Sequence, residues 1–289
     1  MKRLLILFIV IFNISVFSAC GDNTETPTAA IISENVEAEP EILEQEESEQ
    51  IVEIDVTEPA LDYIVIDGEQ FSTSLSELDL RERNLSDNDI VELRHMTELI
   101  RLNLSHNQIS DLSFIADLPY LRRLYLRENQ IMEISPISYL TDIRRLDLRG
   151  NQISDISALS NLTTMRRLNL RDNRVSDITP LSNLNLSVLN LRGNQIRNIV
   201  SLSNMIEMTD LNLNGNLIID IAPLTDMTEL IYLNLRGNEI SDLSPLRDLT
   251  NLMELDLRDN QIRDDSPLAR LRRRDTEIDL RHNPITVMD

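Results

Sequence analysis

Pairs of leucines separated by one residue recur about every 22 positions along most of this chain. Alternation of this kind has the two-residue period of a β-strand, so both leucines should enter an interior while their neighbours face solvent. Ten stacked coils, each with one short parallel strand, are therefore predicted from about Leu75 onward. The pairs are Leu78/Leu80, Leu102/Leu104, Leu124/Leu126, Leu146/Leu148, Leu168/Leu170, Leu189/Leu191, Leu211/Leu213, Leu233/Leu235, Leu255/Leu257 and Ile278/Leu280.

An asparagine follows every leucine pair, three or four residues after its second member. Because a side-chain amide both donates and accepts, a column of asparagines is expected to satisfy turn backbone groups that would otherwise be buried without partners. The residues are Asn84, Asn107, Asn129, Asn151, Asn173, Asn194, Asn216, Asn238, Asn260 and Asn283.

A second apolar segment in each coil, Ile-x-x-Ile followed by Pro-Leu-x-x-Leu, has a period near three. This period predicts a short helical or 3₁₀ turn on the side of the coil opposite the strand. Prolines stand where such turns should begin, since a missing N–H costs little there. They are Pro136, Pro180, Pro223, Pro245 and Pro267.

The combined pattern, L-x-x-L-x-L-x-x-N-x-I-x-x-I, resembles the leucine-rich repeat. Its 22-residue length and Pro-Leu-x-x-Leu segment are similar to the internalin type of bacterial surface proteins. The resemblance implies an α/β-type solenoid with a right-handed coil. A parallel β-sheet would line its concave face, and short 3₁₀ or helical turns its convex face. It also implies that the concave sheet is presented to a protein partner.

Both ends of the predicted repeat domain, residues 75–289, carry departures from the pattern. Two β-prone runs around Asp67-Gly68 predict a β-hairpin, which we interpret as an N-terminal cap spanning residues 59–74. A charged run from Arg270 to Asp275 is expected to close the other end. No apolar tail or wall-sorting motif follows Asp289, so we expect any membrane anchor at the N-terminus.

The first 20 residues look like an export signal. Two basic residues precede an apolar run that is too short to span a membrane, which predicts a signal peptide over residues 1–19. The sequence Phe-Ser-Ala-Cys resembles a bacterial lipobox, which implies that Cys20 is lipidated and begins the mature protein. The alternative is an ordinary cleaved signal with an incidental Cys20. We favour lipidation, because Cys20 is the chain's single cysteine and has no disulfide partner.

Acidic residues are concentrated near the N-terminus. Residues 1–80 hold 2 basic and 18 acidic side chains, whereas the whole chain has a net charge of -22. Residues 20–58 are therefore predicted to form an extended, disordered linker that holds the repeats away from the membrane. The linker could also fold back onto the basic repeats. The strong negative charge argues against nucleic acid as a partner. We expect an exported monomer, lipid-anchored to the outer side of a bacterial membrane.

Catalytic chemistry finds no support in the sequence. His95, His106 and His282 lie in different coils, the last two nearly 40 Å apart at about 4.8 Å per strand. Without a Cys/His cluster or a converging Ser/His/Asp set, we expect no enzyme activity, no cofactor and no metal site. The repeated Ile-Ser-Asp motif suggests either calcium ligands or, with better support, a solvated acidic face. Its aspartates are Asp111, Asp155, Asp177 and Asp242.

Strand residues that flank the buried leucines should form the concave face. In the four coils at Leu102–Leu170 these positions hold seven arginines and three acids, and in the four coils at Leu211–Leu280 three arginines and six acids. The N-terminal half is thus predicted to be basic. Arginine pairs bidentately with carboxylate or phosphate, and tyrosines, interpreted as lying between their leucines, are typical interface anchors. The predicted partner-binding residues are Arg101, Arg123, Tyr125, Arg127, Arg145, Asp147, Arg149, Arg167, Arg171, Arg192 and Tyr232.

Several alternatives remain open. The arginines could instead be paired internally with Asp147, Asp172 or Glu128, which would leave a solvated face without a ligand. The leading hypothesis is a surface-anchored binding module for a protein, with an acidic polysaccharide as the other candidate ligand. The alternatives are a passive structural component of the envelope and an intracellular scaffold similar to the leucine-rich phosphatase regulator.

Overall fold

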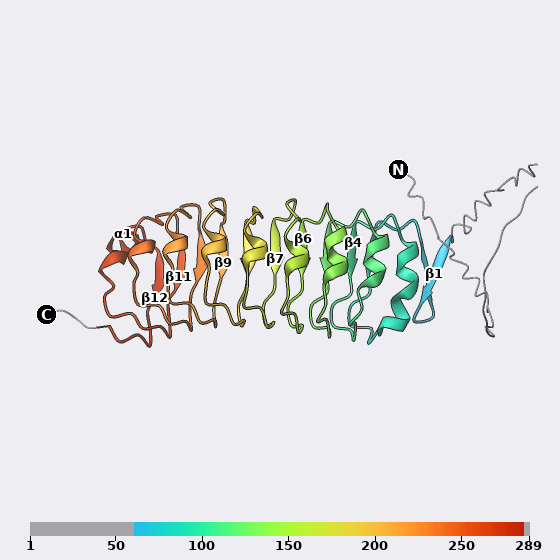
Figure 1. The fold of residues 1–289 in the computed structure, drawn as a ribbon, viewed down its shortest axis with the longest axis horizontal. Coiled ribbons are helices and arrows are strands. Elements are labelled where there is room, and N and C mark those ends of the chain that lie inside the picture. Colours follow the sequence, from blue (N-terminus) through green and yellow to red (C-terminus); the bar gives the residue numbers. More distant parts are fainter. Residues whose placement is uncertain (1–60, 286–289) are drawn as a thin grey trace, which may run out of the picture. The chain divides into compact units, whose positions relative to one another are not determined.

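Residues 61–285 are described by a computed structural model, in which an N-terminal hairpin is followed by successive coils that stack side by side (Figure 1). The predicted signal peptide, Cys20 and the linker to residue 58 lie outside the described residues.

Ten short strands form one sheet, in which the spatial order follows the chain order and every pairing is parallel. This confirms the predicted parallel stack. The strands are β3 (Glu77–Asp79), β4 (Arg101–Asn103), β5 (Arg123–Tyr125), β6 (Arg145–Asp147), β7 (Arg167–Asn169), β8 (Val188–Asn190), β9 (Asp210–Asn212), β10 (Tyr232–Asn234), β11 (Glu254–Asp256) and β12 (Glu277–Asp279).

The leucine pairs form the interior of the stack. The first leucine of a pair is the middle residue of its strand, and the second follows the strand directly. Leu146 and Leu148, for example, are 1% and 0% exposed. Leu146 of β6 lies opposite Leu124 of β5 and Leu168 of β7, so each leucine packs in a column of its counterparts.

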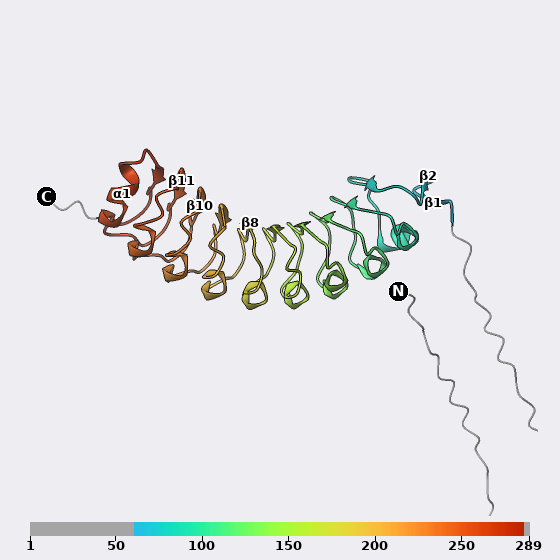
Figure 2. The same ribbon diagram turned by 90° about the horizontal axis from the view of Figure 1, so that it is seen from above.

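Short helical turns line the convex side of the repeat stack, opposite the strands (Figure 2). Five of these turns begin with one of the predicted prolines at their first or second residue. No helix of the described residues is long and apolar enough to cross a membrane. The 3₁₀ turns are η1 (Asp87–His95), η2 (Ser113–Asp117), η3 (Ser135–Tyr139), η4 (Ser157–Leu159), η5 (Thr179–Leu181), η6 (Val200–Leu202), η7 (Ala222–Leu224), η8 (Ser244–Leu246) and η9 (Ser266–Leu268).

The predicted hairpin cap is present. Strands β1 (Tyr63–Ile66) and β2 (Glu69–Ser72) pair antiparallel around Asp67 and Gly68, which both have positive φ, as a tight hairpin turn requires. Ile64 and Ile66 are buried in the same core as the first coils. The Arg83 guanidinium of the first coil lies 5.7 Å from the centre of the Phe71 ring and thereby ties β2 to the stack.

The charged run near the C-terminus does not end the sheet. Its first residues belong to a short helix, α1 (Ala269–Arg272), whose Leu271 is fully buried. After this run β12 still pairs with β11, so the sheet continues for one more strand.

A ladder of asparagines joins neighbouring coils, as predicted. The Nδ2 of Asn151 donates to the carbonyls of Leu126 and Leu148 at 3.0 and 2.9 Å, and its Oδ1 accepts the Ile131 N–H at 3.1 Å. The equivalent three bonds recur at every member from Asn107 to Asn283. We call these nine residues the ladder asparagines.

Asn84 is the exception among the ten predicted asparagines. It is exposed, has a φ of 57°, and its Oδ1 accepts a hydrogen bond from the side chain of Gln108 rather than from a buried backbone group. The extra residue between Leu80 and Asn84 moves it out of the column, so its predicted place in the ladder is wrong.

Replacing a ladder asparagine should destabilise the whole stack. Asn151→Ala removes three hydrogen bonds to buried backbone groups. It leaves the Ile131 N–H without a partner, whereas the Leu126 and Leu148 carbonyls keep their bonds from Asn129 and Asn173. At about 1 kcal/mol for each lost bond, the free energy of unfolding should fall by about 3 kcal/mol. Urea unfolding followed by circular dichroism measures the change. Asn161→Ala, at an exposed site, is the control and should change stability by less than about 0.5 kcal/mol. Equal stability of the two variants would contradict the role of the ladder.

Candidate functional site: the concave face

The concave face consists of rows, because each strand is aligned residue for residue with the next. We call the first residues of the strands the first row. Arg101 lies opposite Arg123, Arg123 opposite Arg145, and Arg145 opposite Arg167. The complete row is Glu77, Arg101, Arg123, Arg145, Arg167, Val188, Asp210, Tyr232, Glu254 and Glu277.

Of the four arginines in the first row, only Arg101 has its charge paired with a carboxylate in the part of the chain that the structure describes. Arg101 forms an ion pair with Glu77 at 3.2 Å, and its guanidinium lies 5.5 Å from the centre of the Tyr125 ring. Arg145 contacts the Tyr125 hydroxyl at 3.5 Å. Within residues 61–285, Arg123, Arg145 and Arg167 form no ion pair, although they are stacked about 4.8 Å apart along the sheet. Stacked like charges destabilise a sheet unless they are compensated.

The second row contains the third residue of each strand and has a structural role. Nine of its ten members are aspartate or asparagine, and each accepts the backbone N–H of the residue two positions later. Asp147, predicted as a partner-binding residue, accepts the N–H of Arg149 in this way at 3.2 Å. Sequence reasoning missed this role. The signal was the recurrence of Asn or Asp between the leucines, with Tyr125 as the one departure.

The third row follows the second leucine of each pair and contains all the remaining predicted arginines. Arg171 pairs with Asp172 at 2.8 Å. The Nε of Arg149 lies 4.0 Å from Glu128 and makes no hydrogen bond within the described residues. Internal pairing is thus partial here: Asp172 pairs, Glu128 stands at the edge of ion-pair range, and Asp147 bonds to the backbone. Arg127 and Arg192 form no ion pair with any carboxylate of the described chain.

Gly150 leaves room for the Glu128 side chain to lie near Arg149. Gly150 has a φ of 67°, and a Cβ added to it would lie 2.6 Å from the Glu128 carboxylate. Both the left-handed backbone and the close approach therefore favour glycine at this position.

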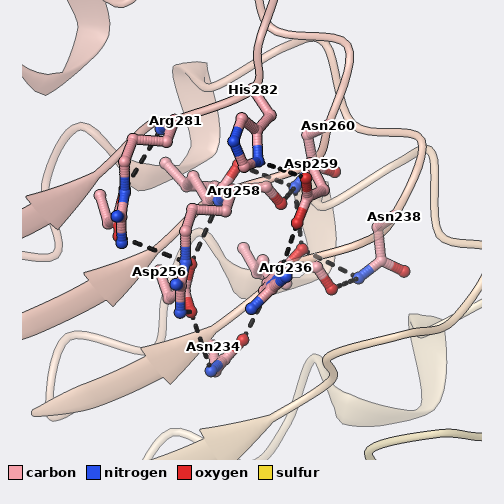
Figure 3. A network of polar contacts seen from close by, with 12 residues as sticks. Asn234, Arg236, Asn238, Asp256, Arg258, Asp259, Asn260, Arg281 and His282 are labelled. Carbon is pink, nitrogen blue, oxygen red and sulfur yellow. Dashed lines mark hydrogen bonds and ion pairs between the residues drawn. The ribbon is translucent and has the colours of Figure 1, made fainter.

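Ionic pairing is extensive at the C-terminal end of the face (Figure 3). Arg236 pairs with Asp259 at 2.8 Å, and Arg258 bridges Asp256 and Asp279 at 2.7 and 3.2 Å. Two further contacts complete this C-terminal charge network, Arg281 with Asp279 at 2.6 Å and His282 Nδ1 with Asp259 at 2.8 Å. Hydrogen bonds from Arg281 lower the pKa of Asp279 to about 2, and those from His282 and Arg236 lower the pKa of Asp259.

Of the hollows on the concave face, two lie one on each side of Val188. A hollow of about 280 Å³ is lined by Tyr125, Arg145, Arg167 and Val188, among others. A second, of about 320 Å³, is lined by Val188, Asp210, Tyr232 and Glu254, among others. Each hollow thus combines one tyrosine with charged residues of one sign from the first row.

Tyr232 was predicted to lie between the leucines of its strand, and this is wrong. It precedes Leu233 and belongs to the first row, opposite Asp210 and Glu254. Tyr125 does lie between Leu124 and Leu126, in the second row. The two tyrosines therefore share the concave face but stand in different rows.

A further set of arginines precedes the first row and was missed by the sequence analysis. Arg122, Arg144 and Arg166 are exposed and stand one residue before β5, β6 and β7. Arg166 donates to the carbonyls of Thr163, Met165 and Asn185. The three Arg-Arg doublets in consecutive coils were the signal that could have revealed them.

The aspartates of the Ile-Ser-Asp motif hold the convex turns. The Oδ1 of each accepts the backbone N–H of the first residue of the following 3₁₀ turn, as Asp177 does from Thr179 at 2.9 Å. Asp111, Asp155 and Asp242 make the same contact at 2.8 Å. Among residues 61–285 no cluster of three or more His, Cys, Asp or Glu is arranged to hold a metal ion. The hydrogen bonds favour a structural role over the calcium alternative.

Comparisons with known proteins agree with this architecture. A family model described as Leucine Rich repeats (2 copies) matches residues 97–139, 141–183 and 228–270. The chain is similar to internalin C2 from Listeria monocytogenes, with 32% identity over 64% of this chain and 83% of that one, and a TM-score of 0.61. Internalin InlF of the same organism is 27% identical over 76% of this chain and 86% of that one, with a TM-score of 0.52. A search of curated proteins gave no significant match.

A plant receptor provides a third comparison. The chain is 28% identical to the leucine-rich repeat ectodomain of the Arabidopsis thaliana receptor kinase GASSHO1/SCHENGEN3, solved in complex with CASPARIAN STRIP INTEGRITY FACTOR 2. The match has a TM-score of 0.64 and covers 73% of this chain but 27% of the ectodomain.

The C-terminal charge network should make stability depend on acid pH. The folded pKa of Asp279, about 2, lies below its unfolded value of about 3.9, so its charge stabilises the fold above about pH 5 and this contribution is lost as pH falls through 2. Asp279→Asn keeps an oxygen that can accept the Arg281 N–H but removes the charge. The thermal midpoint of the wild type should exceed that of Asp279→Asn at neutral pH, and the gap should close in acid.

Calorimetry across this pH range measures the gap. Glu229→Gln, which removes an exposed carboxylate, is the control and should follow the wild type throughout. A wild-type advantage over Asp279→Asn that stays constant down to pH 2 would contradict the role of the Asp279 charge.

Proposed function

The chain belongs to the leucine-rich repeat proteins, and on that premise we propose that it is a non-enzymatic binding module that recognises a protein through its concave face. The arginines of the first row, with Arg127, Arg149, Arg171, Arg192 and Tyr125 around them, would receive acidic side chains of the partner.

The observation that carries this proposal is the uncompensated arginine stack. Arg123, Arg145 and Arg167 stand in register on β5 to β7, and within residues 61–285 none has an ion pair. Their mutual repulsion would be relieved by carboxylates, which match the planar guanidinium in bidentate geometry. The hollow beside Tyr125 offers an apolar contact that an interface anchor requires.

The comparisons give this proposal a precedent in kind. The plant receptor ectodomain is built from leucine-rich repeats too and was solved in complex with CASPARIAN STRIP INTEGRITY FACTOR 2.

We further propose that the protein is exported and anchored through a lipid on Cys20. The lipobox-like sequence before Cys20 supports this, and so does the similarity of the repeats to listerial internalins.

Charge reversal on the first row should abolish partner capture. Full-length chain carrying Arg123→Glu, Arg145→Glu and Arg167→Glu should bind the captured partner at least about tenfold more weakly, a loss of about 1.4 kcal/mol, because attraction becomes repulsion. Affinity capture from surface extracts followed by titration of the captured protein measures the loss.

The matched control carries Arg94→Glu, Arg197→Glu and Arg247→Glu, three exposed arginines outside the three rows of the concave face. It changes the net charge equally and should leave binding intact. Equal retention of the partner by both triple variants would contradict the proposal and favour a passive structural component of the envelope.

A further inference from the structure

Beyond its first residue, Glu77 of β3, the first row changes the sign of its charge once along the sheet. Four arginines occupy it from β4 to β7, and Val188 of β8 is neutral. Beyond Val188 the row continues with Asp210, Tyr232, Glu254 and Glu277 on β9 to β12. The row is therefore dipolar along the axis of the stack.

The acidic part of the row is as uncompensated as the basic part. Asp210 accepts the Thr209 hydroxyl at 2.6 Å, and no basic side chain of the described chain pairs with Asp210, Glu254 or Glu277. The third-row arginines that follow β10 to β12 are engaged with Asp256, Asp259 and Asp279, none of which belongs to the first row. The C-terminal charge network thus leaves the first-row carboxylates free.

The two hollows repeat this division. The one beside Tyr125 lies over the basic part and the one beside Tyr232 over the acidic part, with Val188 lining both. A ligand that filled both hollows would cross the point at which the charge changes sign.

We propose that the partner presents an extended polypeptide segment whose own charge is divided, with acidic residues over β4 to β7 and basic residues over β9 to β12. This inference rests on the proposed function and specifies its ligand. Eight strand spacings of about 4.8 Å give about 38 Å, which an extended segment of about 12 residues spans.

A uniformly anionic ligand fits this row less well. A polyanion would match the arginines, but Asp210, Glu254 and Glu277 would repel its other end. From β4 to β12 a segment with divided charge meets opposite charge on both sides of Val188, whereas a partner with another charge pattern meets like charge and is disfavoured.

Three synthetic peptides of about 12 residues test the inference against the full-length protein. The first has a glutamate block and a lysine block separated by neutral residues, the second has the same composition with alternating charges, and the third carries glutamate only. Fluorescence anisotropy at low salt should show the block peptide binding at least about tenfold more tightly than its alternating isomer, and this preference should shrink at high salt.

Charge reversal of the acidic part gives the sharper result. In Glu254→Lys with Glu277→Lys the affinity for the block peptide should fall, while the affinity for the all-glutamate peptide should rise. The matched control, Glu98→Lys with Glu229→Lys, changes the net charge equally at exposed sites outside the rows and should leave both affinities unchanged.

Each other outcome overturns the inference in a distinct way. If the all-glutamate peptide binds the wild type as tightly as the block peptide, the divided ligand is wrong and the proposed function stands. If no peptide binds, the divided segment is rejected, and partner capture with the arginine variants decides the proposed function. If sedimentation shows a wild-type dimer that Glu254→Lys with Glu277→Lys dissociates, the occupant of the face is a second copy of the chain.

Discussion

Each ladder asparagine is shared between two coils, and this sharing is the constraint on which the rest of the structure depends. Asn151 bonds the carbonyl of Leu148 in its own coil, together with the carbonyl of Leu126 and the amide of Ile131 in the preceding one. All three backbone groups are removed from solvent, where an unpaired amide or carbonyl is costly. A strand that slipped by one residue would break these bonds and turn its leucines outward.

Fixed register converts spacing in the sequence into rows on the surface. A residue directly before a strand leucine must lie in the first row, so arginines 22 residues apart become neighbours about 4.8 Å apart. The C-terminal coils offset such crowding with carboxylates, as the bridge from Arg258 to Asp256 and Asp279 shows. The N-terminal coils leave Arg123, Arg145 and Arg167 without this compensation, and that contrast is the basis for assigning the binding surface.

The fold could be predicted from the sequence because the same pattern of apolar and polar residues recurs in each coil. Leucine spacing, ladder asparagines, turn prolines and the Asp-Gly hairpin each have a local physical reason, and each was predicted. Single residues that depart from the repeat pattern were harder to place from the sequence. Asn84 left the ladder because one extra residue precedes it, and Tyr232 was assigned to the wrong side of its leucine.

The roles of the polar residues could be predicted only in part. Asp147 can reach a neighbouring arginine or the backbone two residues ahead, and its choice of the Arg149 N–H depends on the turn geometry at the strand end. Whether an arginine is paired likewise depends on side-chain directions that the repeat pattern does not specify. The acidic pairing of Arg236, Arg258 and Arg281 joins different rows and coils, so counting charges position by position did not reveal it.

Disulfide crosslinking tests the register most directly, because adjacent in-register residues of neighbouring strands lie within the Cα separation that a disulfide spans, whereas residues offset by two do not. With Cys20 replaced by serine, the pair Arg123→Cys and Arg145→Cys should oxidise rapidly, and the pair Arg123→Cys and Asp147→Cys should not. Faster crosslinking of the second pair would contradict the alignment of the first row and remove the basis for the arginine surface.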